Sequence, residues 1–309
     1  MSKADIIYRD TCREIIDNGF SDENLDVRPH WEDGTPAHTK KKFGVVNRYN
    51  LAEEFPLMTL RRTYWKSAID EMLWIWQKKS NRVAELSSHV WDQWADENGT
   101  IGSSYGYQIG KPYIHHTVKD AGNKPLNELE DLSAYPSAYI EYDAEKDVAN
   151  VWMDQVDGVL WDLRNNRASR RIMTSTYEFG ELHAMGLYPC AYSMTFNVTG
   201  DTLNGVLHQR SQDMLAANNW NVVQYAALMM MIAKATGLKV GELVHVIVDC
   251  HIYDRHIPLV EKMLENEPLP APKMFLDTEE TDFYKITKND FRVEDYSFHP
   301  FDEKIEIAI

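Results

Sequence analysis

Cysteine is scarce in this chain, and the few cysteines present form no recognisable motif. Cys12, Cys190 and Cys250 are odd in number, and no two of them have the CxxC spacing of a zinc or redox site. A framework of disulfides is therefore not expected, and free thiols of this kind are typical of a cytoplasmic protein. The sequence predicts no metal site.

Long hydrophobic runs are also missing. No stretch approaches the roughly 18 consecutive apolar residues of a membrane-spanning helix. The opening residues, MSKADIIYRDTCREI, lack the apolar core of a signal peptide. Neither a membrane span nor export is expected, and we predict a cytoplasmic location.

Positive charge is in short supply. The chain has 32 Lys and Arg against 48 Asp and Glu, a formal net charge of -16 at pH 7. Such a surface repels a phosphate backbone, so nucleic acid is not expected as the main partner. Hydrophobic residues make up 44% of the 309 positions, enough for a large packed core.

The sequence patterns predict a mixture of helices and strands without a regular βαβ rhythm. Helices are expected over residues 4–18, 64–77 and 156–166, and from Asn221 to a stop at Gly237. Strands are expected over residues 170–177, 192–198, 203–210 and 243–248, with a hairpin turn at 199–201. This mixture favours an α+β fold, a mixed sheet backed by helices. We predict a single domain over residues 1–309, with a peripheral insertion at about 110–149 that lacks a clear period.

The stretch LYPCAYSMTF, residues 187–196, places a lone cysteine before a predicted strand. A free cysteine in a globular chain is often a small apolar filler. A nucleophilic thiol needs a nearby cation to favour the thiolate, and the predicted hairpin brings Arg210 to Cys190. Both interpretations of Cys190 remain open from the local sequence.

The segment HQRSQDMLAANNWN, residues 208–221, is the densest polar cluster between core-like stretches. Its polar side chains are either surface loop residues or groups held at the core that need a partner or a ligand. The side-chain amide of Asn221 offers a donor and an acceptor, which suits either the edge of a pyrimidine or a helix N-cap.

Other candidate residues also have two interpretations. Arg170 and Arg171 are adjacent at a strand start, where they form a solvated edge or hold an anion if a second subunit presents them. Glu71 is a solvated acid beside Asp70, or a carboxylate in a pocket wall whose pKa is raised by desolvation.

Aromatic side chains add two further candidate features. Trp91 and Trp94, three residues apart, are core residues or a platform for a flat heterocycle. His251 and Tyr253 share one face at a strand end, as in a ligand pocket or a sheet rim.

Taken in order, these segments resemble the folate-dependent thymidylate synthase family over nearly the whole chain. The motifs that carry the resemblance are FPLMT, DEMLW, VWDQWADENG, YGYQ, SRRI, LYPC, QRSQDM, WNVVQY, GELVH, DCHIYDRH and the terminal IAI. The resemblance implies reductive methylation of dUMP to dTMP with 5,10-methylenetetrahydrofolate as one-carbon and hydride donor. It also implies the thymidylate synthase fold, with sheets that pack across a homodimer.

The resemblance assigns roles to particular residues. The catalytic set implied is Cys190 as nucleophile with Glu71, Tyr105, Arg210, Asp213 and Asn221. The dUMP contacts implied are Arg28, Gln209, Arg210, Ser211, Asp213, Asn221, His251 and Tyr253, with Arg170 and Arg171 from the partner subunit. The folate contacts implied are Arg61, Trp91, Trp94, Leu187, Asp213, Ala217, Trp220, Ala308 and Ile309.

The chain departs from the common family pattern at several positions. Ala191 follows the cysteine where many members have His, and Ala217 stands where glycine is common. Asn218 and Asn219 replace the usual leucine and proline, and Arg28 precedes PHWEDGTP instead of a compact glycine-rich turn.

Three other functions compete with the synthase. A dUMP hydroxymethylase would make the same base contact through Asn221, whereas the relatives that act on dCMP carry aspartate there. A non-catalytic nucleotide- or RNA-binding relative would not need to retain Cys190, Arg210 and Glu71. A cysteine hydrolase that pairs Cys190 with His251 lacks an evident oxyanion motif.

Overall fold

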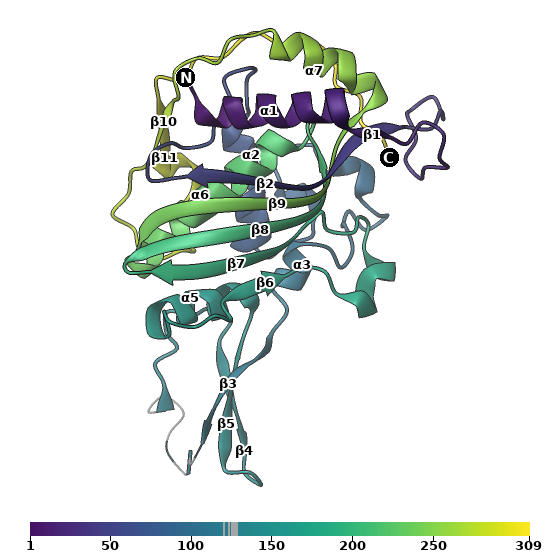
Figure 1. Cartoon of the computed structure of the whole chain (residues 1–309). Helices are drawn as coiled ribbons and strands as arrows, with labels where there is room; N and C mark the ends of the chain where they lie inside the picture. The colour runs from purple at the N-terminus through teal and green to yellow at the C-terminus, as the bar shows by residue number, and fades with distance from the viewer. Residues whose placement is uncertain (120, 123, 125–128) are drawn as a thin grey trace.

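The computed structural model describes residues 1–119, 121–122, 124 and 129–309, and a six-stranded mixed sheet forms its centre (Figure 1). The strands follow the order β1-β2-β9-β8-β7-β6. Their bounds are β1 (Phe20–Ser21), β2 (Thr39–Asn50), β6 (Met173–Ser175), β7 (Ala191–Thr199), β8 (Thr202–Asp213) and β9 (Lys239–Tyr253). β8 and β9 run parallel and the other neighbouring pairs run antiparallel. The predicted α+β class with a mixed sheet is confirmed.

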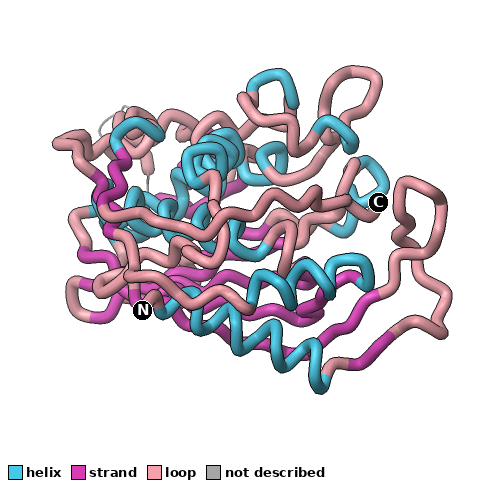
Figure 2. Tube along the Cα trace, turned by 90° about the horizontal axis from the view of Figure 1, so that it is seen from above, coloured by secondary structure: helices cyan, strands magenta, loops and turns pink. Residues whose placement is uncertain are grey.

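Helices cover the sheet and carry several of the candidate residues. The α-helices are α1 (Lys3–Asn18), α2 (Trp65–Trp76), α3 (Gly106–Ile109), α5 (Gln155–Asn165), α6 (Asn218–Thr236) and α7 (Ile257–Leu264). α6 packs against β8 and β9, and α2 packs against α6. Helices α1 and α7 lie side by side, and the two chain termini lie far apart (Figures 1 and 2). The helices that carry Glu71 and Asn221 are therefore direct neighbours.

The local sequence explains why these elements form where they do. The predicted hairpin of β7 and β8 turns at Gly200, whose φ of 65° favours glycine, and Thr199 pairs with Thr202 across the turn. α6 ends at Gly237, also in the left-handed region, whose N–H donates to the carbonyls of Ala233 and Lys234. α2 is buried on nearly every side, because Trp74 and Ile75 are apolar on the face opposite its main stripe.

Several predicted boundaries are wrong, and β8 and β9 extend well beyond the strands predicted over residues 203–210 and 243–248. α6 begins at Asn218, three residues before the predicted start, so Asn221 lies inside the first turn and the N-cap is Ala217. The strand predicted over residues 170–177 shrinks to Met173–Ser175. This strand lies at the sheet edge and pairs on one side with β7, which leaves Arg170 and Arg171 in the preceding loop.

A second, three-stranded sheet projects away from the main sheet (Figure 1). It contains β3 (Tyr113–Lys119), β4 (Tyr139–Asp143) and β5 (Val148–Met153) in the order β3-β5-β4. It forms from most of the predicted insertion, of which residues 120, 123 and 125–128 lie outside the described residues. A small pair, β10 (Lys273–Leu276) and β11 (Phe291–Glu294), completes the strands. Among the described residues, no helix has the length and apolar character needed to cross a membrane.

Candidate active site

One cavity of about 470 Å³ collects most of the predicted site residues. Its wall is built from α2, the start of α6, the ends of β8 and β9, and the last residues of the chain. The predicted residues that line it are Arg61, Glu71, Trp91, Trp94, Tyr105, Leu187, Cys190, Gln209, Ser211, Asp213, Ala217, Trp220, Asn221, His251, Tyr253 and Ala308. Residues from almost the whole length of the chain therefore meet in one place.

Cys190 lies in the cavity wall directly before β7 and is partly exposed, unlike the buried Cys12 and Cys250. Its backbone N–H donates to the hydroxyl of Tyr105 at 3.0 Å, and its carbonyl accepts from the N–H of Arg210 at 2.9 Å. Burial raises the pKa of the Cys190 thiol, while the positive charges of Arg210 and Arg28 lower it without cancelling the effect. In the ligand-free protein the sulfur is thus a thiol whose pKa two arginines lower in part.

Arg210 binds the backbone of the segment that precedes Cys190. It lies on β8, opposite the start of β7, as the predicted hairpin requires. Its guanidinium group donates to the carbonyl of Pro189 at 3.0 Å and to that of Tyr188 at 2.7 Å. The side chain therefore fixes the position of Cys190, although it does not line the cavity itself.

Tyr105 approaches Cys190 from the opposite segment with an unusual backbone conformation. Its φ of 42° is rare for a residue with a side chain. The next residue, Gly106, has no room for a side chain, because an added Cβ would lie 2.1 Å from the carbonyl oxygen of Ser80. Close packing at Gly106 thus holds Tyr105 in the strained conformation that directs its hydroxyl to Cys190.

Glu71 is a buried carboxylate in the cavity wall, not a solvated acid. Its side chain is only 5% exposed, and its Oε2 accepts a hydrogen bond from the indole N–H of Trp220 at 2.7 Å. Burial raises the pKa of Glu71, and the nearby N–H groups of Trp220, Gln224 and Trp91 partly offset that rise. Trp220 alone of the three reaches hydrogen-bond distance in the described part of the chain.

A chain of side-chain amides sets the orientation of Asn221. Burial lowers the pKa of His245 to about 3, so its ring is neutral, and its Nε2 lies 2.8 Å from Oε1 of Gln209. The Nε2 of Gln209 donates to Oδ1 of Asn221 at 3.2 Å, and Nδ2 of Asn221 donates to Oε1 of Gln224 at 3.1 Å. Asn221 therefore lines the cavity as an amide with a fixed direction, which is what recognition of a base edge requires.

Asp213 is a buried carboxylate at the end of β8. Its Oδ1 accepts from the backbone N–H groups of Leu215 and Ala216, and its Oδ2 lies 3.8 Å from Nδ1 of His256. Burial alone would raise the pKa of Asp213, but the contact with His256 and these backbone N–H groups bring it below its usual value. Asp213 is therefore ionised at neutral pH and faces the cavity as a hydrogen-bond acceptor.

Aromatic rings form much of the remaining wall. Trp91 contacts Trp94 and Tyr105 edge to face, with ring centroids 5.4 and 5.3 Å apart. His251 and Tyr253 contact each other in the same way at 5.1 Å, and Nδ1 of His251 lies 2.8 Å from a carboxylate oxygen of Asp249. These apolar faces with polar tips suit a flat heterocycle and a sugar.

Five predicted residues, Arg28, Arg170, Arg171, Arg210 and Ile309, do not line the cavity. The charge of Arg28 nevertheless lowers the pKa of Cys190. Arg170 and Arg171 are exposed, and within the described residues neither guanidinium has a hydrogen bond or an ion pair. Ile309 pairs with His30 through the backbone.

Some cavity residues were missed from the sequence. Gln212, Asn219, Arg62, Tyr64, Gln93 and Ile307 also line the cavity. Most of them flank a residue that was predicted, so adjacency to the motifs was the signal that could have found them. Among the residues that the structure describes, no group of three or more His, Cys, Asp or Glu side chains has the arrangement of a metal site.

The fold and the cavity together define a protein with a mixed sheet and a cavity in which a partly exposed thiol faces aromatic walls. The family profile described as Thymidylate synthase matches residues 6–309. The thymidylate synthase of Bacillus phage phi3T is 40% identical over 300 residues, and thymidylate synthase 1 of Bacillus subtilis strain 168 is equally similar, with 96% of each chain covered in both cases. The solved structure of thermostable thymidylate synthase A from Bacillus subtilis has a TM-score of 0.82 and 38% identity, with 99% of both chains covered. The chain belongs to the thymidylate synthase family and is a methyltransferase.

Proposed function

We propose that this protein converts dUMP to dTMP by reductive methylation, with 5,10-methylenetetrahydrofolate as cosubstrate and dihydrofolate as the second product. A covalent bond between Cys190 and C6 of the uracil ring activates the substrate. The observation that carries the proposal is that Cys190, Asn221 and Glu71 line one cavity with flat aromatic walls. The comparisons do not favour a hydroxymethylase or a non-catalytic binding protein.

Cys190 acts as the nucleophile. Uracil C5 is too weakly nucleophilic to take up a carbon unit by itself. Addition of Sγ to C6 moves electron density to C5 and O4, and C5 then becomes reactive. The thiol must lose its proton on the way, and Arg210 and Arg28 favour the thiolate that results. The sulfur leaves C6 at the end of the cycle.

Asn221, Glu71 and Tyr105 form hydrogen bonds with the base or transfer its protons. The amide of Asn221 accepts from N3–H and donates to O4, where negative charge develops. Glu71 has a raised pKa, which lets it hold a proton near O4 and release it through water. Tyr105 takes part in removing the proton from C5.

The cavity also fits the reduced folate. Trp91, Trp94 and Trp220 supply flat faces, and the ionised Asp213 accepts hydrogen bonds from a pterin-like ring. When bound, the cosubstrate supplies one carbon and the hydride that reduces it to a methyl group. Leu187, Ala217 and Ala308 complete the apolar wall, and Arg61, which also lines the cavity, pairs with the carboxylate tail of the folate.

The phosphate and sugar of dUMP are held at the other end. Arg210, Ser211 and Arg28 bind the phosphate, and Gln209, which donates to the carbonyl of Ser211, helps to hold this segment in place. His251 and Tyr253 bind the 3′-hydroxyl. Arg170 and Arg171 of the partner subunit complete the phosphate site. Since both arginines are exposed at the edge of the sheet, a second copy can use them.

The homodimer forms through the open face of the main sheet. Phe43, Val46 and Val248 are exposed on β2 and β9, by 85%, 53% and 43%. Neighbouring apolar side chains of this kind are a typical surface for association.

We further propose that residues 1–309 form one catalytic domain with a peripheral insertion at 110–149, and that the enzyme acts in the cytoplasm.

Replacement of Trp220 by Phe tests the role of its N–H. The ring stays, but the hydrogen bond to Glu71 is lost, so the carboxylate is less stabilised and the pKa of Glu71 rises further. The limb of the kcat–pH profile that reports Glu71 is expected to move up by about one pH unit, as a hydrogen bond to a charged group of roughly 1.5 kcal/mol implies.

Trp94→Phe is the matched control. Trp94 lines the same cavity, but within the described residues its indole donates no hydrogen bond to Glu71. An unchanged kcat–pH profile in Trp220→Phe, or an equal shift in Trp94→Phe, would show that the Trp220 N–H does not set the pKa of Glu71.

A mixing experiment tests the shared site. A subunit with Arg170→Ala and Arg171→Ala, and a subunit with Cys190→Ala, are each expected to be inactive as homodimers. After subunit exchange, hybrid dimers contain one intact site, and activity should recover to about a quarter of the wild-type value. No recovery, in a mixture that mass measurement shows to contain hybrids, would mean that the arginines do not serve the partner.

The reaction itself is tested by its second product. Loss of dUMP should be accompanied by an equal formation of dihydrofolate, seen as a rise in absorbance. A hydroxymethylase consumes dUMP without that rise, so dUMP loss without dihydrofolate would refute the proposed function.

A further inference from the structure

The C-terminal tail, defined as residues 303–309, forms part of the cavity wall in the ligand-free protein. Ile307 and Ala308 line the cavity. Ile309 exchanges two backbone hydrogen bonds with His30, of 2.9 and 3.0 Å. The tail therefore lies against the phosphate-site loop, defined as residues 28–38, which carries Arg28.

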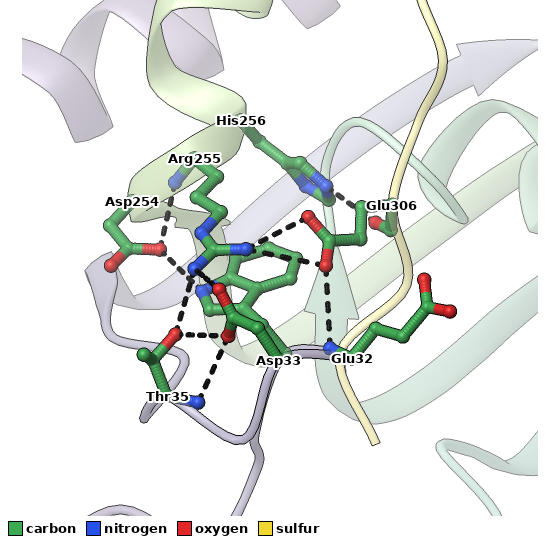
Figure 3. A network of polar contacts seen from close by, with 8 residues as sticks. Glu32, Asp33, Thr35, Asp254, Arg255, His256 and Glu306 are labelled. Carbon is green, nitrogen blue, oxygen red and sulfur yellow. Dashed lines mark hydrogen bonds and ion pairs between the residues drawn. The ribbon is translucent and has the colours of Figure 1, made fainter.

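Arg255 connects the tail to this loop (Figure 3). It lies in the short 3₁₀ helix η4 (Asp254–His256), between β9 and α7. One guanidinium nitrogen donates to Asp33 and Thr35 at 2.7 Å each, and the other donates to Glu306 at 3.1 Å. A single side chain thus joins three segments that are remote in the sequence.

The guanidinium group is held in place by its surroundings. It lies over the ring of Trp31, 5.0 Å from the centroid, and Trp31 is only 3% exposed. The indole N–H of Trp31 donates to Asp254 at 3.1 Å, the residue just before Arg255. Stacking and forked hydrogen bonding at the same time require a planar group, which lysine does not have.

His256 makes a second link to the tail. Its Nε2 lies 2.8 Å from the backbone carbonyl of Glu306, and its Nδ1 lies 3.8 Å from the carboxylate of Asp213. The 3₁₀ helix therefore touches the tail on one side and a cavity carboxylate on the other. A shift of the tail therefore reaches Asp213 through a single side chain, that of His256.

The phosphate-site loop is linked to the nucleotide end of the cavity as well. Nδ1 of His30 lies 2.8 Å from the carbonyl oxygen of Arg28. His30 also pairs with Ile309 through the backbone, so this one residue contacts both Arg28 and the end of the tail.

We propose that Arg255 is a positioning residue that fastens the C-terminal tail over the folate part of the cavity and ties it to the loop that carries Arg28, before any ligand binds. The inference rests on the proposed function for the identity of the ligands. An exposed ion pair alone contributes little to stability, but Arg255 belongs to a network with stacking and several hydrogen bonds. Loss of Arg255 frees the tail and leaves the fold intact.

Hydrogen exchange in the ligand-free protein tests the fastening directly. In Arg255→Gln, the amides of the tail and of residues 30–35 are expected to exchange roughly fivefold faster or more than in the wild type. Arg292→Gln is the matched control, because Arg292 also pairs with two carboxylates, Asp277 and Glu294, and lies over the ring of Phe275. The control is expected to leave exchange of the tail unchanged.

Kinetics provide the second readout. Arg255→Gln should raise the KM for the folate roughly fivefold or more, and dUMP binding should weaken by a smaller factor because the loop that carries Arg28 is loosened as well. Unchanged tail exchange in Arg255→Gln, or an equal change in Arg292→Gln, would overturn the proposal. If Arg255→Gln does not fold, Glu306→Ala removes the same link from the tail side and must give the same two changes. The exchange measurement needs no substrate, so it stands or falls separately from the proposed function.

Discussion

Replacement of Cys190 by alanine should abolish turnover while dUMP still binds. Without sulfur no bond to C6 forms, and uracil C5 stays too weak a nucleophile, so kcat is expected to fall by roughly 10⁴-fold or more. The phosphate and base contacts come from other side chains, and the dissociation constant of dUMP should change by no more than about threefold. Single-turnover kinetics and calorimetric titration separate the two quantities.

Cys250→Ala is the control for this experiment. Cys250 is a free thiol that is fully buried on β9, and its sulfur contacts Met214 away from the cavity. Its replacement should lower stability by about 1 kcal/mol and leave turnover intact. Residual turnover near the wild-type value in Cys190→Ala would show that the thiol is not the nucleophile.

Replacement of Asn221 by aspartate should change which base is accepted. The amide pairs with the N3–H donor and the O4 acceptor of uracil, whereas a carboxylate only accepts when ionised and repels O4. We expect kcat/KM for dUMP to fall by roughly 10²-fold or more and the dCMP to dUMP preference to rise by a similar factor. Competition between the two nucleotides measures the ratio directly.

Asn219→Asp is the matched control for base selectivity. Asn219 lines the same cavity two residues earlier, and its side chain accepts a hydrogen bond from Thr63. It introduces the same charge without touching the amide chain of Gln209 and Gln224. If Asn221→Asp keeps the wild-type preference, or Asn219→Asp alters it equally, the edge-pairing role is wrong.

Local patterns in the sequence were sufficient for much of the fold. The hairpin of β7 and β8 could be predicted because a turn residue of positive φ separates two alternating stretches. Its register then brought Arg210 to Cys190, as expected. The stop of α6 at Gly237 followed from the same conformational freedom.

Boundaries that depend on tertiary pairing could not be predicted. Arg170 and Arg171 have the local signal of a strand start, but β6 pairs only where β7 is available to it, from Met173 onward. Asparagine is a preferred N-cap residue, and Asn221 was therefore a candidate for the helix start. Packing of α6 on the sheet nevertheless extends the helix back to Asn218.

The contacts that hold the site residues in position could not be predicted from the sequence either. Trp220 and Glu71 are 149 positions apart, and the indole hydrogen bond between them has no local signature. The same is true of Arg255 and Asp33, which are 222 positions apart. Such contacts depend on how remote elements pack, and a motif identifies only one of the two partners.

The central claim is most directly tested by the intact mass of the protein after incubation with 5-fluoro-dUMP and 5,10-methylenetetrahydrofolate. Fluorine at C5 cannot leave as a proton does, so the cycle should stop with both ligands attached. We expect a mass increase of one nucleotide plus one folate per occupied site, located on the peptide that contains Cys190. An unchanged mass, or a modification on a peptide without Cys190, would contradict it.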